Sequence, residues 1–256
     1  MVGSSMPRDT RVEEGSAPVD VAGQKRLAGE AALDEVSSGM RLGLGTGSTV
    51  RYFLEALARR LAGSELVDVS GVPTSRETSE LCRSLGIPEL ELDEMDDLDL
   101  AVDGADEVSP ALDLIKGLGG ALLREKIVAQ AARRFVVIVD SGKEVRRLGE
   151  RSPLPVEVVP FGWRRHLPFL RSLGCEAVPR ASGAGELLVS DNGNYLIDLH
   201  FPSPLDDPAE MEEALRARAG VVATGFFLGM ADLALVGTAE GGVRRLSAEG
   251  GAGSSA

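Results

Sequence analysis

The chain has 256 residues, 43% of them hydrophobic, which is enough for one large hydrophobic core or two smaller ones. A formal charge of −13 and an aromatic content of 4% argue against a nucleic-acid partner, because the surface would repel phosphate and offer few rings for base stacking. No apolar run approaches the roughly 18 residues of a membrane span, and the N-terminus lacks the apolar stretch of a secretory signal. We therefore expect a cytoplasmic protein with no membrane partner.

The two cysteines do not suggest a metal site. Cys82 and Cys175 are far apart in the sequence and form no Cys-x-x-Cys pair. Neither a zinc site nor a disulfide framework is indicated, and we expect both thiols to be buried.

Lysine is rare in this chain. Only four of the 27 basic residues are lysines, namely Lys25, Lys116, Lys126 and Lys143, so the other 23 are arginines. A lysine is preferred to an arginine where a compact, rotatable ammonium is needed. Lys116 and Lys143 adjoin glycines and are the stronger candidates for a binding site.

The first half of the chain alternates strands and helices, a pattern that predicts parallel strand pairing. Residues 1–20 and 247–256 are rich in small and charged residues and are predicted to be disordered tails. The expected elements are a helix at 23–36, a strand, turn and helix within 41–61, a strand at 66–75, a helix at 75–86 closed by Gly86, a strand within 97–108, a helix after the glycines of 115–129, and a buried strand within 133–145.

The second half has a different pattern, which predicts a small α+β unit. A helix is expected at 162–174, a hairpin at 187–201 turning at Asn192-Gly193, and a helix at 207–220. The apolar segment 231–237 resembles the earlier buried strands and is expected to rejoin the first sheet.

The predicted fold is α/β, an open, mostly parallel Rossmann-like sheet with helices on both faces and a smaller inserted α+β domain. Residues 21–148 and 229–246 would form the catalytic domain, and residues 149–228 the insertion.

The segment GLGTGST, residues 43–49, is a glycine-rich turn after the first strand. It is not a dinucleotide fingerprint, because Ser48 stands where the third glycine belongs and no acidic residue ends the next strand. It also lacks the lysine of a Walker A loop. Its backbone N–H groups and the hydroxyls of Thr46, Ser48 and Thr49 suit one phosphate or a sugar hydroxyl. An ordinary capped turn is an equally good interpretation of this segment alone.

Asp103 and Asp106 stand out from a long acidic run that otherwise reads as a solvated loop. They flank Gly104 and Ala105 at the end of a predicted strand. Small residues there let a ligand approach the backbone, and two neighbouring carboxylates can divide acid and base roles.

Glu125 is the third candidate carboxylate. If its helix begins near Gly119, then Leu123, Ile127 and Ala131 form the predicted buried stripe, and Glu125 lies about 200° around the helix from Leu123. An isolated glutamate there would be solvated, as we expect Lys126 to be. Glu125 is nevertheless expected at the same sheet edge as the glycine turn and Asp103, which favours a functional role.

Five segments in this order and spacing closely resemble the type A ribose-5-phosphate isomerase family: GLGTGST, DGADEV, KGLGGALLREKIVA, VDSGKEV and PLPVEVVPFGW. Two more, DNGNYLIDLHF and ADLALVGT, extend the likeness to about residue 240. The resemblance implies an aldose-ketose isomerase of the non-oxidative pentose phosphate pathway, which interconverts ribose 5-phosphate and ribulose 5-phosphate. It also implies no metal, no cofactor and a homodimer or homotetramer. One departure is Leu118, where the family commonly has glycine.

The resemblance also implies roles for individual residues. Glu125 matches the family's proton acceptor, so it would be the general base of an enediol mechanism. Lys116 would offset charge on the enediolate oxygen, and Asp103 or Asp106 would assist ring opening and proton movement between oxygens. The implied substrate-binding residues are Lys25, Thr46, Gly47, Ser48, Thr49, Asp103, Gly104, Ala105, Asp106, Lys116, Gly117, Leu118, Gly119 and Lys143.

Two other functions fit parts of the pattern. A non-catalytic sugar-phosphate sensor would keep the phosphate turn but have no use for Glu125 together with Lys116, and no DNA-binding helix pair precedes residue 20. An acyl or CoA transferase of related architecture would use a glutamate as a nucleophile. An assay for ribulose 5-phosphate formation distinguishes these functions from the isomerase.

Overall fold

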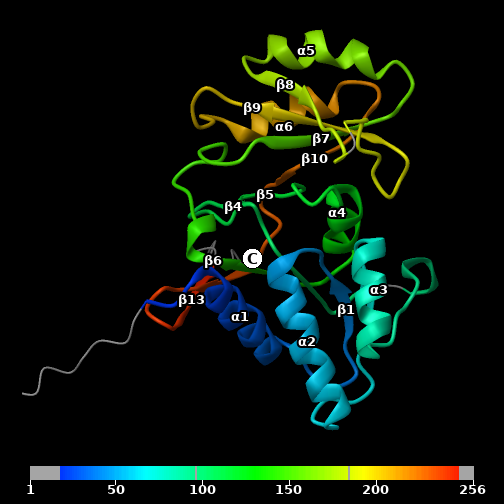
Figure 1. Cartoon of the computed structure of the whole chain (residues 1–256), viewed down its shortest axis with the longest axis vertical. Coiled ribbons are helices and arrows are strands. Elements are labelled where there is room, and N and C mark those ends of the chain that lie inside the picture. Colours follow the sequence, from blue (N-terminus) through cyan, green and yellow to red (C-terminus); the bar gives the residue numbers. More distant parts are fainter. Residues whose placement is uncertain (1–17, 96, 184, 248–256) are drawn as a thin grey trace, which may run out of the picture.

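The computed structural model describes residues 18–95, 97–183 and 185–247. Its named strands form sheets of six, four and three strands (Figure 1). Most of the predicted tails, residues 1–17 and 248–256, lie outside the described part of the chain. Two tail residues that are described belong to the fold: Asp20 caps the first helix, and Ser247 is the last residue of a strand.

The six-stranded sheet confirms the predicted α/β fold class. All its neighbouring pairs are parallel except the antiparallel pair at the β13 edge, which the sequence analysis did not predict. The segment predicted to rejoin this sheet does so, because β12 pairs in parallel with β6. In order across the sheet the strands are β13 (Val243–Ser247), β12 (Leu233–Gly237), β6 (Phe135–Asp140), β3 (Leu100–Asp103), β1 (Arg41–Leu44) and β2 (Ser70–Pro73).

Helices flank this sheet, and two of them, α1 and α3, begin at residues whose side chains cap the helix. The Asp20 carboxylate accepts a hydrogen bond from Gly23 N at the start of α1, and Ser75 caps α3 in the same way. The α3 helix ends at Gly86 in the left-handed conformation, as predicted. The helices of this part are α1 (Val21–Ala31), its 3-10 extension (Ala32–Glu35), α2 (Ser48–Ala62), α3 (Arg76–Leu85), a 3-10 turn (Leu92–Glu94), α4 (Leu122–Gln130) and a 3-10 turn (Ser141–Lys143).

The four-stranded sheet is antiparallel and is accompanied by two helices, which confirms the small α+β unit predicted for the second half. The predicted turn at Asn192-Gly193 is present, with Gly193 at φ 80°. Of the two strands predicted for this hairpin, only the one after the turn, β9, is a named strand. The elements are β7 (Leu154–Val158), a 3-10 turn (Trp163–Arg165), α5 (His166–Ser172), β8 (Glu176–Pro179), β9 (Tyr195–His200), α6 (Pro208–Arg216) and β10 (Val221–Thr224).

A small antiparallel sheet, which the sequence analysis did not predict, lies between the two larger ones (Figure 1). It consists of β4 (Glu107–Val108), β5 (Leu114–Ile115) and β11 (Phe226–Phe227). These six residues are all buried. The sheet therefore connects the two halves of the chain through main-chain hydrogen bonds.

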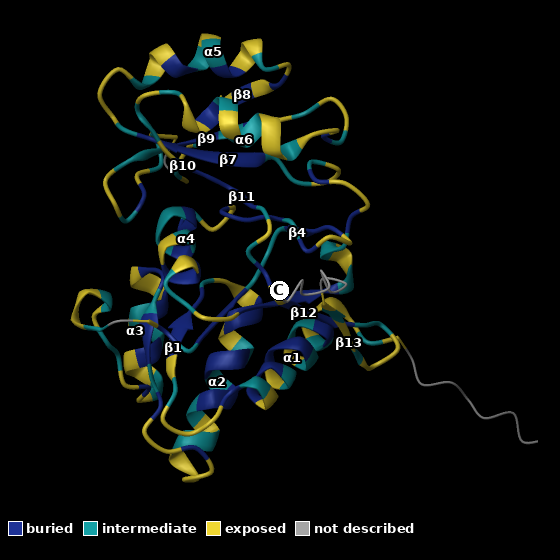
Figure 2. Cartoon of the chain, turned by 180° about the vertical axis from the view of Figure 1, so that it is seen from behind, coloured by how far each residue is buried: buried dark blue, intermediate teal, exposed yellow. Residues whose placement is uncertain are grey.

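The largest hydrophobic core lies between the helices and the six-stranded sheet. In it, Phe53 and Leu57 of α2 pack with Leu42, Val102 and Ile138 of the strands, and all five side chains are inaccessible to water. Strands β7 and β12 are buried along their whole length (Figure 2).

Both cysteines are free and buried, as predicted. Within the described residues, no helix has the length and apolar character needed to cross a membrane.

Candidate active site

The candidate site lies at the carboxyl edge of the six-stranded sheet. Strand β1 ends before the glycine turn, β3 ends at Asp103, and β6 ends at Asp140 before the turn that carries Lys143. Because the strands are parallel, these ends meet at one edge, where open α/β sheets bind ligands. A cavity of about 180 Å³ opens here, lined by Lys25, Thr46, Gly47, Ser48, Thr49, Gly104, Ala105, Asp106, Lys116, Gly117, Gly119, Glu125 and Lys143.

The lining therefore brings together most of the residues singled out from the sequence. Two members of the predicted set do not line the cavity. Asp103 lies beneath it and is 3% exposed, whereas Leu118 carries its side chain outward and is 40% exposed.

Lys116 is the centre of a buried charge cluster. Its Nζ lies 3.1 Å from Asp103 Oδ2 and 3.4 Å from Glu125 Oε1, and it donates a 2.5 Å hydrogen bond to the carbonyl of Gly104. The ammonium also lies 5.4 Å from the ring centroid of Phe227. An ammonium held by four partners in this way is a fixed positive charge at the cavity wall.

The cluster changes the acidity of its members. Burial lowers the pKa of Lys116, but the charges of Asp103, Glu125 and Asp106 outweigh burial, so its pKa lies above the usual value and the ammonium stays charged. Burial raises the pKa of Glu125 to about 8; Lys116 opposes this shift, and the charges of Asp103 and Asp106 add to it. A carboxylate with this pKa can both take and return a proton near neutral pH.

Asp103 is held from several sides. Its Oδ1 accepts hydrogen bonds from Thr46 N at 3.1 Å and Gly104 N at 2.7 Å, while Oδ2 faces Lys116. Burial raises its pKa against the opposing effects of Lys116 and these two N–H groups. Gly45 makes the close approach possible, because a Cβ at that position would lie 2.2 Å from the Asp103 carboxylate.

Glu125 lies on the buried face of α4, so the predicted stripe of Leu123, Ile127 and Ala131 is wrong. Ile127 is 45% exposed, whereas Glu125 is 5% exposed. The inward residues of α4 are Leu122, Glu125, Val128 and Ala129. The physical reason is Lys116, which stabilises a carboxylate on the face that would otherwise be wholly apolar. Glu125 Oε2 is buried and has no hydrogen-bond partner among the described residues, so it is available to a ligand.

Lys126, the next residue, is not solvated as expected. Its Nζ lies 3.6 Å from Glu212 Oε1 and 5.1 Å from the Phe227 ring centroid. Its side chain is 15% exposed. Burial lowers the pKa of Lys126, and Glu212 opposes this shift. Lys126 does not line the cavity.

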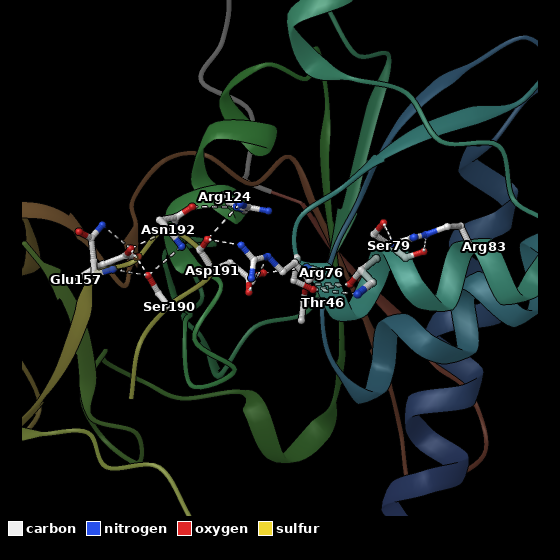
Figure 3. Close-up of polar contacts among 12 residues, drawn as sticks. Thr46, Arg76, Ser79, Arg83, Arg124, Glu157, Ser190, Asp191 and Asn192 are labelled. Carbon is white, nitrogen blue, oxygen red and sulfur yellow. Dashed lines mark hydrogen bonds and ion pairs between the residues drawn. The ribbon is translucent and has the colours of Figure 1, made fainter. Parts of the chain in front are cut away.

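The glycine turn meets the N-terminus of α2, where unpaired N–H groups favour an anion. Lys25, from α1, donates a 3.0 Å hydrogen bond to Ser48 Oγ, so its ammonium stands beside that helix end. Thr46 belongs to the same turn. Its hydroxyl makes hydrogen bonds with Thr74, Ser75 and Thr78 at 2.8 to 3.0 Å, in the polar network that Figure 3 shows around Thr46, and these bonds fix the turn at the cavity.

The loop at residues 117–120 accommodates the leucine that departs from the family pattern. Gly117 and Gly120 have φ of 104° and 83°, a region that favours glycine, but Leu118 is not among the residues with positive φ. Leucine is therefore unstrained at this position. Its N–H donates a 3.0 Å hydrogen bond to Asp106 Oδ2, which holds the second aspartate against the loop.

Comparisons with known proteins identify the family of this chain. The family model of ribose 5-phosphate isomerase A (phosphoriboisomerase A) matches residues 70–241. The ribose-5-phosphate isomerase A of Roseiflexus castenholzii is 54% identical over 217 residues, which are 85% of this chain and 92% of the relative. The chain belongs to the ribose 5-phosphate isomerase A family.

Solved structures of the ribose 5-phosphate isomerase family have the same fold. A D-ribose-5-phosphate isomerase in complex with phospho-erythronic acid superposes with a TM-score of 0.87 at 41% identity, covering 90% of this chain and 100% of that chain. The Plasmodium falciparum ribose 5-phosphate isomerase gives 0.86 at 36% identity, with the same coverage.

Several residues at the candidate site of this family member were not predicted from the sequence. Thr74, Ser75 and Thr78 fix the glycine turn, and Phe227 packs against Lys116. Arg180 reaches the glycine loop from the edge of the four-stranded sheet. The segment VPTS before α3 carried a weak signal for the hydroxyl cluster; Phe227 and Arg180 are too distant in sequence for any motif to reveal.

The turn at 190–192 joins the two halves of this isomerase fold beside the site. Asp191 Oδ2 accepts a 2.8 Å hydrogen bond from Arg76 N at the start of α3, and Asn192 Oδ1 accepts a 2.9 Å bond from Arg124 Nε on α4 (Figure 3). Buried Glu157 in turn accepts hydrogen bonds from Ser190 and Asn192. The turn thus links α3, whose Thr78 supports the glycine turn, to α4, which carries Glu125.

Proposed function

We propose that this protein interconverts D-ribose 5-phosphate and D-ribulose 5-phosphate through an enediol, with Glu125 as the general base. One observation carries this proposal: Lys116 is held between Asp103 and Glu125 at a cavity whose lining also includes the glycine turn at the N-terminus of α2. Family membership supports the isomerase activity.

The proposed reaction begins when Glu125 Oε2 takes the proton from carbon 2 of the open-chain aldose. The electron pair moves toward carbon 1, and the carbonyl oxygen there becomes negatively charged. Lys116 stabilises this charge, because its ammonium is already fixed in place before the reaction. A proton then passes from the hydroxyl on carbon 2 to the oxygen on carbon 1, the carbon 2 oxygen becomes the carbonyl, and Glu125 returns its proton to carbon 1, which gives the ketose.

Asp103 and Asp106 are proposed to move protons between oxygens and to assist ring opening. Asp106 lines the cavity and is the aspartate that can touch the sugar, whereas Asp103 is buried beneath it and paired with Lys116. We therefore assign the direct contact to Asp106 and the support of Lys116 to Asp103.

The phosphate is proposed to bind at the opposite end, between the N-terminus of α2 and the ammonium groups of Lys25 and Lys143. Two cations and a helix N-terminus favour a dianion despite the overall charge of −13.

A coupled assay for ribulose 5-phosphate formation tests the proposal. A sensor would bind the sugar phosphate without turnover, and an acyl or CoA transferase would form a covalent intermediate on its glutamate. The single open oxygen of Glu125 and the charged lysine beside it favour proton transfer.

We also propose the remaining features that family membership suggests: a homodimer or homotetramer without metal or cofactor, a catalytic domain at 21–148 and 229–246, and a smaller domain at 149–228. Within the described residues, no group of three or more His, Cys, Asp and Glu side chains is placed to hold a metal ion.

Ribose 5-phosphate is expected to raise the melting temperature, whereas ribose at the same concentration is expected to raise it far less. A ligand stabilises the folded state according to its affinity, and ribose lacks the group that Lys25, Lys143 and the α2 N-terminus would bind. NAD is expected to have no effect. Equal stabilisation by ribose and its phosphate, measured by calorimetry, would mean that the turn is not an anion site.

The kcat/KM of the enzyme is expected to rise with pH through about 8 and to level off above it. Glu125 must be ionised to accept a proton, and its pKa is raised to about 8. Because it interacts with Lys116 and Asp103, the measured value belongs to the cluster. A pH profile with a single limb near the ordinary glutamate pKa of 4.5 would contradict this assignment.

A further inference from the structure

Arg180 connects the four-stranded sheet to the loop that carries Leu118 and Gly119. Its Nη1 donates hydrogen bonds to the carbonyl of Gly117 at 2.9 Å and to the carbonyl of Leu118 at 3.0 Å. The side chain is 13% exposed. Arg180 therefore holds two successive carbonyls of the loop from outside the cavity.

The guanidinium is itself fixed by Asp198 of β9. Its Nε donates a 2.9 Å hydrogen bond to Asp198 Oδ2, and its Nη2 bonds Oδ1. This bidentate pairing sets the plane of the guanidinium, which a lysine could not reproduce.

The two carbonyl contacts, together with the 3.0 Å hydrogen bond from Gly120 N to the Gly117 carbonyl, fix where the next N–H groups point. A trans peptide is planar, so its carbonyl and its N–H point in opposite directions. With the Gly117 carbonyl on Arg180, the N–H of Leu118 points the other way, and it does bond Asp106 at 3.0 Å. The same geometry turns the N–H of Gly119 away from Arg180.

The N–H of Gly119 has no acceptor within the described part of the chain, and Gly119 lines the cavity together with Glu125 and Lys116. Successive N–H groups that point to one side form an anion-binding concavity. One of these two donors is occupied by Asp106, and the other remains open to a ligand.

We propose that Arg180 is a positioning residue for the isomerase reaction: it holds the glycine loop so that the Gly119 N–H donates to the oxygen that becomes negative in the enediolate. The inference rests on the function proposed above. Arg180 acts through the loop and does not touch the substrate. Displacing a catalytic donor by about 1 Å costs on the order of a hundredfold in rate.

The test compares Arg180→Lys with the wild type in kcat/KM and in affinity for two anions. Phospho-erythronic acid carries a carboxylate that resembles the enediolate charge, and inorganic phosphate reports only the phosphate end. We expect kcat/KM and the affinity for phospho-erythronic acid to fall together, by about ten- to a hundredfold, with phosphate affinity changed by less than about twofold. If the role of Arg180 were purely structural, the substitution would lower the affinity for both anions equally or for neither.

Arg171→Lys on α5 is the matched control, because Arg171 is exposed and distant from the loop. If Arg180→Lys does not fold, Asp198→Asn carries the same test, since it keeps the arginine but loosens its orientation. The inference is overturned if kcat/KM stays within about twofold of wild type, or if the affinities for both anions fall equally. An inactive wild type would instead overturn the proposed function, so the two failures are distinguishable.

Discussion

Glu125→Gln is expected to lower kcat by roughly 10²–10⁴-fold, toward the upper end of this range, while affinity for ribose 5-phosphate stays nearly unchanged. Glutamine keeps the size and the helix propensity of glutamate, so α4 should form normally. The substitution removes the basic oxygen, and abstraction of a proton from a weakly acidic carbon depends on it. Steady-state kinetics and binding of ribose 5-phosphate to the variant measure both effects.

Glu80→Gln is the matched control for this substitution. Glu80 lies exposed on α3 and does not line the cavity. Lys126 is unsuitable as a solvated control because its side chain is only 15% exposed and is paired with Glu212. If Glu125→Gln keeps more than about a tenth of wild-type turnover, well short of the expected loss, the proton carrier must be sought at Asp106 or Asp103.

The same variant has an expected effect on stability. The pKa of Glu125 is raised from 4.5 to about 8, so the folded state retains a proton that the unfolded state releases. The stability contributed by this group is therefore complete below pH 4.5 and is lost as pH rises through 8. Glutamine cannot ionise. In urea unfolding, the free energy of unfolding of Glu125→Gln, relative to that of the wild type, should increase as pH rises from 4.5 to about 8.

Lys116→Met is expected to lower kcat/KM by about 10²–10³-fold and also to destabilise the fold. The kinetic loss follows from removal of the charge that offsets the enediolate. The structural loss follows because Asp103 and Glu125 are left buried without a cation, and breaking a buried pair in this way costs about 3–5 kcal/mol. The measurements are steady-state kinetics and urea unfolding at pH 5 and pH 8.

Destabilisation of Lys116→Met should be greater at pH 8, because at the lower pH the two carboxylates can be neutralised by protons. Adding Glu125→Gln to Lys116→Met should restore part of the stability but none of the activity.

Lys126→Met is the matched control for Lys116→Met. It removes a second, half-buried lysine that is ion-paired and lies over Phe227, yet does not line the cavity. Activity loss as large in Lys126→Met as in Lys116→Met would contradict a specific role for Lys116.

The position of the site was predictable from the sequence because parallel strands place their carboxyl ends at one edge. Glycine after β1, Asp103 at the end of β3 and Lys143 after β6 identified that edge without knowledge of the packing. Capping signals identified helix ends in the same way, as at Gly86.

The orientation of α4 was not predictable from hydrophobic periodicity. Leu123 and Ile127 follow helical spacing, but the face that carries Glu125 is the buried one. A charged residue can occupy a buried face when another segment supplies the counter-charge, and Lys116 lies outside the helix. Local pattern cannot contain that information.

The contacts that join the two halves of the chain were also missed. Strands β4, β5 and β11 have two residues each, too few to show any period. Arg180 reaches the carbonyls of Gly117 and Leu118 across more than sixty positions of sequence. Such contacts depend on how the two halves pack, so only the three-dimensional structure reveals them.

The most direct test of the proposed mechanism is to follow isotope exchange during turnover in ²H₂O with excess EDTA. If Glu125 carries the proton between carbons 2 and 1, solvent exchanges with it in some turnovers. Ribulose 5-phosphate should then acquire deuterium at carbon 1, as detected by NMR, and chelation should not slow the reaction. Complete transfer of the carbon 2 hydrogen with no deuterium incorporation, or turnover that EDTA abolishes and a divalent ion restores, would contradict the enediol mechanism in favour of a metal-assisted hydride shift.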